Sequence, residues 1–213
     1  MVVTPHNVHV DRHFAVVTAG EVSGEFAEHE LEAPTDRELA GAILEVLGVE
    51  GIPALGVSYG GNDLREARMP LDGGALVPLW FLQRTPVVLV SPARDRSWDE
   101  HVRAGAALAR ATGRRRIALI ASADHGHAHD ADGPYGFDAA AAEYDGRIVE
   151  LVEANRLERL LYLEPSLVER AKADSLWQLL MLHGAVGDGY DAELLAYERP
   201  TYYGMLCAAY SPR

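Results

Sequence analysis

The feature that most constrains the fold is an alternation of short apolar runs with amphipathic helical segments. The β-branched run Pro86–Val90 precedes an Ala-rich amphipathic segment, Trp98–Ala111, which ends before Gly113, and a second β-branched run follows at Ile117–Ala121. Short apolar runs of this kind predict buried strands, and longer segments with one apolar stripe predict helices. Strands that alternate with helices favour crossover connections, so we predict an α/β protein with a mostly parallel sheet covered on both faces.

The same pattern extends along the rest of the chain. Thr35-Asp36 predicts the start of a helix that runs from Arg37 to about Val46. A chain of 213 residues that is 48% hydrophobic can bury one sizeable core, so we expect a single domain over residues 1–213. Further strands are predicted at Phe14–Thr18, Ala54–Val57, Ala192–Tyr197 and Met205–Tyr210, and further helices within Ala75–Leu82 and at Ala139–Val152, Pro165–Arg170 and Ser175–Ala185.

Charge and cysteine content narrow the classes of partner. The formal net charge of −13 repels phosphate backbones and acidic lipids, so neither nucleic acid nor a membrane surface is an expected partner. Cys207 is the single cysteine, so no intramolecular disulfide can form. No apolar run approaches the ~20 residues that span a bilayer, and the N-terminus lacks the pattern of a signal peptide. The expected location is therefore the cytoplasm.

Two loops that bear histidines follow predicted strands. One is Thr4-Pro5-His6-Asn7, and the other spans residues 123–129 after Ile117–Ala121. Ligands of parallel α/β folds bind beyond the carboxyl ends of the strands, so we expect both loops to border one cavity. His6 could be a metal ligand, since imidazole is the commonest one, or a loop histidine bonded to backbone. His9 and His13 are expected to be solvated, or to support the residues that bind the metal without binding it themselves.

The second loop carries histidines at alternate positions, His125, His127 and His129. In an extended segment all three would point the same way and could hold zinc. Gly126 and the following acidic and glycine residues instead indicate a turn-rich loop. We therefore expect one of the three to face the site as a general acid or base and the other two to be solvated. Asp124 is a candidate carboxylate partner, and Asp72-Gly73-Gly74 indicates either close approach of backbone to a ligand or a tight turn.

Taken in order, these segments resemble the class III extradiol ring-cleavage dioxygenases, the relatives of the catalytic subunit of protocatechuate 4,5-dioxygenase, and the related Memo proteins. "VVTPHNVHVDRHFAVVTA" is similar to the family's strand followed by Ser-Pro-His-Gly, and "PLDGGALVPLWFL" is similar to Leu-Asp-His-Gly-x-x-Val-Pro-Leu-x-Phe-Leu. "IASADHGHAHDADGPYGFDAAAAEYD" resembles Ala-Ser-Gly-Asp-Leu-Ser-His followed by Asp-x-Pro-Tyr-Gly and Glu-Phe-Asp. The resemblance covers nearly the whole chain and implies a three-layer α/β/α fold.

The resemblance also implies a non-haem Fe(II), held by two histidines and a carboxylate, that opens a catechol-type ring with O2. His6 corresponds to one iron-ligand histidine and His127 to the acid/base histidine. The other ligand histidine belongs to a first strand and loop that the chain lacks in this comparison. The family's glutamate aligns with Ala173, so the adjacent Asp174 could replace it only if the helix shifts, and the histidine of Asp-His-Gly is Gly73 here.

Three functions therefore stay open. The first is an extradiol dioxygenase for a small aromatic substrate, with an incomplete iron site that His9, His13, His29, His125 or a second subunit of a homo-oligomer would complete. The second is a non-catalytic relative, without metal, that binds a small molecule or a protein in the same pocket. The third is a metallohydrolase with zinc at His6 and the loop of residues 125–129.

Overall fold

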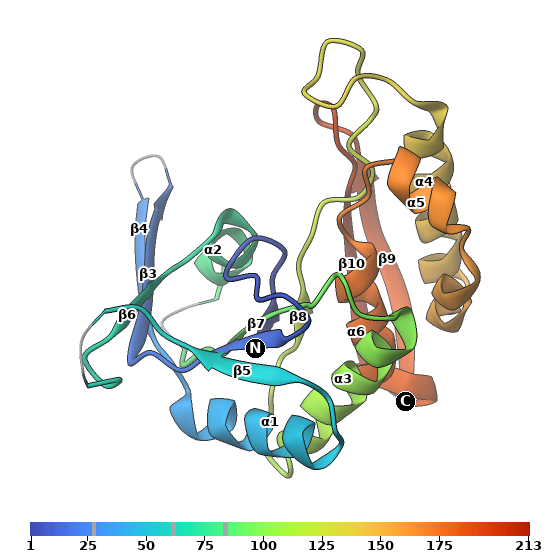
Figure 1. The fold of residues 1–213 in the computed structure, drawn as a ribbon. Helices are drawn as coiled ribbons and strands as arrows, with labels where there is room; N and C mark the ends of the chain where they lie inside the picture. Colours follow the sequence, from blue (N-terminus) through green and yellow to red (C-terminus); the bar gives the residue numbers. More distant parts are fainter. Residues whose placement is uncertain (27–28, 61–62, 83–84) are drawn as a thin grey trace.

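A computed structural model describes residues 1–26, 29–60, 63–82 and 85–213 of the chain. Its centre is a sheet in the order β5-β2-β7-β1-β8 (Figure 1). β5 with β2, β7 with β1, and β1 with β8 pair in parallel, whereas β2 and β7 are antiparallel. The prediction of a mostly parallel sheet is thus confirmed. In sheet order the strands span Ala54–Val57, Phe14–Val17, Leu89–Ser91, Val2–Val3 and Ile120–Ala121.

Helices cover both faces of this sheet, as the three-layer prediction requires (Figure 1). Successive strand residues point to opposite faces, and the two residues of β1 show this directly. Val3 packs into a core with α1 (Arg37–Val49) and α3 (Trp98–Ala111), whereas Val2 packs on the other side with α2 (Gly73–Trp80). The central strands are therefore apolar on both faces, which is why they read as continuous apolar runs.

A second, three-stranded sheet in the order β4-β3-β6 was not predicted from the sequence. β3 (Glu21–Phe26) and β4 (His29–Pro34) form an antiparallel hairpin, and β6 (Arg68–Pro70) pairs with β3 in parallel. Val22 and Met69 are buried in this sheet, while acidic residues occupy much of β3 and β4. One-sided burial of short, charged strands leaves little apolar periodicity for sequence reasoning to detect.

The C-terminal half adds helices and a separate hairpin. β9 (Tyr190–Glu198) and β10 (Met205–Pro212) pair with each other in an antiparallel two-stranded sheet. The two predicted C-terminal strands are thus present but do not join the central sheet in the described part of the chain. The helical elements here are α4 (Ala139–Glu153), η1 (Leu157–Tyr162), α5 (Pro165–Arg170), α6 (Leu176–Val186) and η2 (Gly187–Gly189).

Helix ends follow the expected chemistry. Asp36 caps α1, because its Oδ1 accepts a hydrogen bond from the Leu39 backbone N–H at 3.0 Å. Ser97 and Glu100 form a reciprocal capping box at the start of α3. These local bonds fix where each helix begins and so where the preceding loops leave the sheet.

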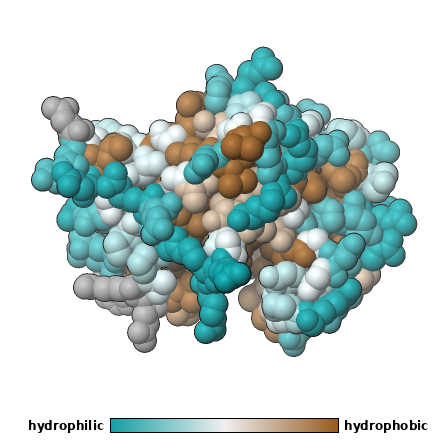
Figure 2. Space-filling model, turned by 90° about the horizontal axis from the view of Figure 1, so that it is seen from below, coloured by the Kyte–Doolittle hydropathy of each residue, from teal (hydrophilic) through white to brown (hydrophobic). Residues whose placement is uncertain are grey.

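The surface combines apolar and polar regions. Seen from below, apolar side chains gather near the middle of the face, with hydrophilic side chains around them (Figure 2). Large apolar side chains that stay exposed include Val49, Phe81 and Tyr162. Within the described ranges, no helix combines the length and the apolar character that a membrane crossing requires.

Candidate functional site

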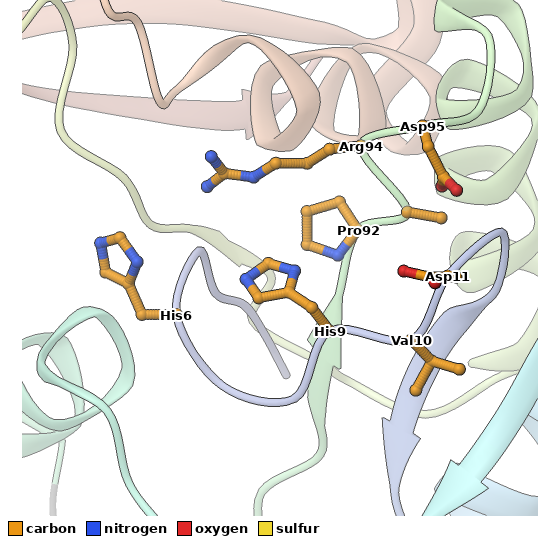
Figure 3. A pocket seen from close by; sticks show the side chains of 8 residues that line it. His6, His9, Val10, Asp11, Pro92, Arg94 and Asp95 are labelled. Carbon is orange, nitrogen blue, oxygen red and sulfur yellow. The ribbon is translucent and has the colours of Figure 1, made fainter.

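Two loops leave the same edge of the sheet side by side. β1 and β7 run in parallel with Val3 opposite Val90, so Thr4-Pro5-His6 and Ser91-Pro92-Ala93-Arg94 leave at equivalent points. A pocket of about 400 Å³ lies between them. Figure 3 shows the His6 imidazole and the Arg94 guanidinium on one side of the pocket and the Asp11 and Asp95 carboxylates at its other end. The lining residues are His6, His9, Val10, Asp11, Pro92, Ala93, Arg94 and Asp95.

Asp174 is the carboxylate behind this pocket. It precedes α6, its side chain is only 6% exposed, and its Oδ1 accepts a hydrogen bond from Arg94 Nη2. Its Oδ2 is buried without a hydrogen-bond partner and lies 3.7 Å from His6 Nε2. The structure therefore places the Asp174 carboxylate beside His6, although Asp174 is one position beyond the residue that aligns with the family's glutamate.

His127 lies on the other loop, and the negative charge of Asp174 acts on it. Its Nδ1 lies 2.9 Å from the Lys172 carbonyl oxygen, and its Nε2 lies 3.4 Å from Asp124 Oδ2. Partial burial acts to lower the pKa of His127. Three effects outweigh burial and raise that pKa above the usual value of histidine. They are the interaction with the Asp124 side chain, the interaction with the Lys172 carbonyl, and the negative charges of Asp124 and Asp174. Both His6 and His127 thus interact with Asp174.

Three tyrosine rings surround the His127 imidazole. The ring centroid of Tyr135 lies 5.5 Å from that of His127, and those of Tyr202 and Tyr203 each lie 5.9 Å away. Tyr202 and Tyr203 belong to the turn between β9 and β10, so the C-terminal hairpin closes over the histidine loop. The Tyr202 and Tyr203 rings also contact each other, with 5.0 Å between their centroids, so the imidazole lies in a continuous aromatic surrounding. Aromatic side chains with a few polar groups among them are typical of sites for flat, apolar ligands. Neither His127 nor any other residue of the 123–129 loop lines the 400 Å³ pocket. The expectation that both histidine loops border one cavity is therefore not met at this pocket.

The expectation that His125 and His129 are solvated is wrong. His125 is 3% exposed, and its Nδ1 lies 2.7 Å from Ser175 Oγ, which in turn lies 2.9 Å from the Tyr144 hydroxyl. Burial lowers the pKa of His125, so the ring is neutral. His129 is 8% exposed, and its Nε2 lies 2.9 Å from Asp145 Oδ2. Both rings serve the packing of the loop, because they are held by Ser175 and Asp145 inside the protein. The turn-rich loop expected here is also not found at these histidines: residues 122–130 form no turn or bend, and the turns begin at residue 131.

The other sequence-predicted residues take supporting positions. Exposed His9 lines the pocket, whereas His13 Nδ1 lies 2.8 Å from the Asp11 carbonyl oxygen. Asp72 accepts hydrogen bonds from Thr4 Oγ1 and from Asn7, at 3.4 Å for Asn7, and so fixes the loop that carries His6. The side chain of His29 lies outside the described residues.

The two glycines after Asp72 differ in what they permit. A Cβ on Gly73 would meet no atom within 4 Å, so Gly73 is not needed for close approach. A Cβ on Gly74 would lie 2.6 Å from Pro5 Cδ, so Gly74 lets α2 pack against the His6 loop. The close backbone approach considered from the sequence is therefore to the chain's own loop.

The donor atoms fit part of a metal site. Two ligand atoms that each bind one ion at about 2.1 Å lie at most about 4.2 Å apart, so the 3.7 Å between His6 Nε2 and Asp174 Oδ2 allows them to share an ion. Across the ranges that the structure describes, however, no three His, Cys, Asp or Glu side chains form a group that could hold one. An iron site of two histidines and a carboxylate therefore does not fit the residues present.

Sequence reasoning missed Arg94 and the aromatic residues around the site. Arg94 stacks over the Trp177 ring, with 4.9 Å from its guanidinium carbon to the ring centroid. The Ser91-Pro92 dipeptide repeats the Thr4-Pro5 pattern directly after a strand, and this repetition was the available signal. Nothing local in the sequence indicated that Tyr202 and Tyr203 lie beside His127, because a chain reversal brings them there.

Comparison with known proteins adds three findings. The family model described as the catalytic LigB subunit of aromatic ring-opening dioxygenase matches residues 1–208. Protein CA_C1420 of Clostridium acetobutylicum is 26% identical over 213 aligned positions, which cover 93% of this chain but 45% of that protein. The chain thus spans less than half the length of this curated relative. The crystal structure of uncharacterized protein JW3007 from Escherichia coli K12 matches with a TM-score of 0.67 and 18% identity, over 98% of this chain and 84% of that one, and shows the same fold.

Proposed function

The chain belongs to the family of catalytic LigB subunits of aromatic ring-opening dioxygenases, and we propose that it binds a catechol-type aromatic ligand and that His127 takes a proton from a ligand hydroxyl. The observation that carries this proposal is the setting of His127, a titratable imidazole fixed between a carbonyl and a carboxylate and surrounded by tyrosine rings. General bases act best when their pKa lies near the working pH, and an imidazole meets this condition.

The hydrogen bonds of His127 identify the atom that exchanges the proton. Nδ1 lies close to two carbonyl oxygens, those of Lys172 at 2.9 Å and His125 at 3.1 Å. A carbonyl only accepts, so Nδ1 carries hydrogen in both protonation states. Nε2 is therefore the atom that gains or loses a proton, and the nearby Asp124 carboxylate stabilises its protonated form. A ligand hydroxyl at Nε2 would become a phenolate.

We do not extend the proposal to oxidative ring opening or to zinc hydrolysis by this chain alone. The described residues bring together His6 and Asp174 as donors, which is one fewer than the iron site of the family resemblance needs. His125 and His129 are engaged by Ser175 and Asp145, so the histidine loop does not supply zinc ligands. Binding of an aromatic ligand with proton transfer to His127 requires only His127 and the groups around it, all of which are present.

The proposal is tested with catechol at pH 8 under argon. Phenolic hydroxyls ionise near pH 10, so free catechol is mostly neutral at this pH. Ionisation shifts its ultraviolet absorption to longer wavelength, so a difference spectrum reports the protonation state of the bound ligand. We expect wild-type protein to bind catechol in the ionised form. The His127→Gln variant should still bind it, with affinity within about tenfold of wild type, but in the neutral form.

A matched control is His183→Gln, because His183 lies on α6 and the charges that act on it are Glu158 and Asp188, which are not residues of the site. This variant should ionise bound catechol as wild type does. Ionised catechol bound to His127→Gln, or no binding of catechol to wild-type protein, would contradict the proposal.

A further inference from the structure

The Asp174 carboxylate already has a cation. Arg94 Nη2 donates to Oδ1 of Asp174 and lies 3.4 Å from the Pro5 carbonyl oxygen, in the loop that carries His6. The guanidinium also stacks on Trp177. These contacts come from two separate parts of the chain, the loop that carries His6 and the start of α6, and they hold the positive charge of Arg94 at one place beside the pocket.

We propose that Arg94 is an internal cation that occupies the place of a metal ion and makes the His6–Asp174 pair a weak metal site. A divalent ion bound between His6 Nε2 and Asp174 Oδ2 would share its carboxylate with a fixed guanidinium. Two positive charges close together repel each other, and beside the buried Asp174 carboxylate water screens this repulsion only in part. The negative charge that would attract the ion is also already neutralised. The inference is independent of the aromatic ligand and of His127.

The unpartnered Oδ2 of Asp174 supports this assignment. A buried carboxylate oxygen without a hydrogen bond is unfavourable, so this oxygen is available to a further donor or to a cation. His6 Nε2 lies 3.7 Å from this oxygen, which is too distant for a hydrogen bond. Removal of Arg94 would leave both carboxylate oxygens without a cation, and a divalent ion would then replace the lost charge.

The test measures binding of Co²⁺, whose visible absorption changes when nitrogen and carboxylate ligands replace water. Wild-type protein, Arg94→Met and Arg94→Gln are titrated with Co²⁺ at pH 7.5. We expect both variants to bind at least about tenfold more tightly than wild type, because the fixed positive charge is gone. Co²⁺ should also raise the melting temperature of the variants more than that of wild type, since an ion that binds only the folded state stabilises it.

Three further variants show whether the gain belongs to this site. Adding His6→Ala or Asp174→Asn to Arg94→Met should abolish the gain. Arg96→Met is the matched control, because Arg96 is two residues away and pairs with Glu100 instead of Asp174; it should bind Co²⁺ as wild type does.

The proposal is overturned if both Arg94 variants fold and bind Co²⁺ no more tightly than wild type, or if their gain survives loss of His6. Should neither Arg94 variant fold, wild-type protein alone decides. Tight, one-to-one binding to wild type that His6→Ala and Asp174→Asn each abolish would overturn the proposal, whereas weak binding that neither change alters would support it.

Discussion

At the scale of single residues, surroundings give chemically identical imidazoles different protonation behaviour. The partners of His127 raise its pKa, whereas burial lowers that of His125. Burial lowers the pKa of His101, on α3, to about 4. Of these three histidines, His127 is the one that combines a carboxylate partner with partial exposure, and this combination suits it to exchange protons.

His101 gives the first prediction. Its side chain is fully buried, its Nε2 has no hydrogen-bond partner, and its ring packs edge-on against Phe14. Its pKa of about 4 in the folded protein lies below the usual histidine value of 6.5, so below pH 6.5 the unfolded chain binds a proton that the folded protein does not. The neutral His101 ring therefore gives its full contribution to the free energy of unfolding above pH 6.5. As the pH falls to 4, protonation of the unfolded chain lowers that free energy by about 3 kcal/mol. Urea unfolding at several pH values should show this loss in wild type and less of it in His101→Phe; equal pH dependence of the two would refute it.

The sequence predicts which residues lie at the end of a strand better than it predicts the direction in which their side chains point. His6, directly after β1, lies at the pocket as expected from its place at a strand end. The directions of His125 and His129 depend on their distant partners Ser175 and Asp145, which local sequence does not specify. The contact of Asp174 with Arg94 joins residues 80 positions apart and could not be predicted from spacing.

At the scale of elements, the packing of α3 on α6 depends on two glycines. A Cβ on Gly105 would lie 1.8 Å from the Met181 carbonyl oxygen, and one on Gly184 would lie 1.9 Å from that of Val102. Helix propensity alone would favour alanine at both positions by about 1 kcal/mol. The close approach of the two backbones therefore determines the residue, and it overrides propensity.

This packing gives the second prediction. Gly105→Ala should lower the free energy of unfolding by about 3 kcal/mol, because the helices must separate to admit the methyl group. Gly146→Ala, on α4, is the control, since its Cβ would meet no atom within 4 Å. It should raise stability by about 0.5–1 kcal/mol. Urea unfolding followed by circular dichroism measures both, and comparable effects of the two changes would show that the helix contact is looser than described.

Elements with strong apolar periodicity were predicted well, and weakly patterned ones were not. α3 has the predicted bounds of Trp98–Ala111, and α1 starts at the predicted Arg37. The run Ile117–Ala121 forms a strand only at Ile120–Ala121, because its partner β1 offers two residues for pairing. β3 and β4 were missed because their charged residues hide a single buried face.

At the scale of the whole molecule, the buried Asp145 joins three parts of the chain. Its carboxylate accepts hydrogen bonds from the Gly126 backbone N–H at 2.7 Å and from the Tyr197 hydroxyl at 2.5 Å, and it pairs with His129. The histidine loop, α4 and the β9–β10 hairpin thus meet at one side chain. A Cβ on Gly204 would lie 1.9 Å from Asp145 Oδ2, so the hairpin can approach this closely only with glycine there.

Tyr197→Phe gives the third prediction. Loss of a hydrogen bond to a buried carboxylate should cost about 1.5–3 kcal/mol of unfolding free energy. It should also loosen the tyrosine rings around His127, since Tyr202 and Tyr203 follow β9 directly. Hydrogen exchange should become faster at the backbone N–H of His125, which donates to the Gly204 carbonyl. Unchanged exchange there would mean that the hairpin and the loop are not coupled through Asp145.

The central claim is that His127 Nε2 receives the proton of a bound phenolic hydroxyl, and nitrogen NMR of the histidine side chains tests it most directly. With 15N-labelled histidine, at a pH above the His127 transition measured on the free protein, that ring should be the neutral tautomer with hydrogen on Nδ1. Saturating catechol should convert its signals to those of the imidazolium while the signals of His183 stay unchanged. A His127 ring that stays neutral in the catechol complex would contradict the account.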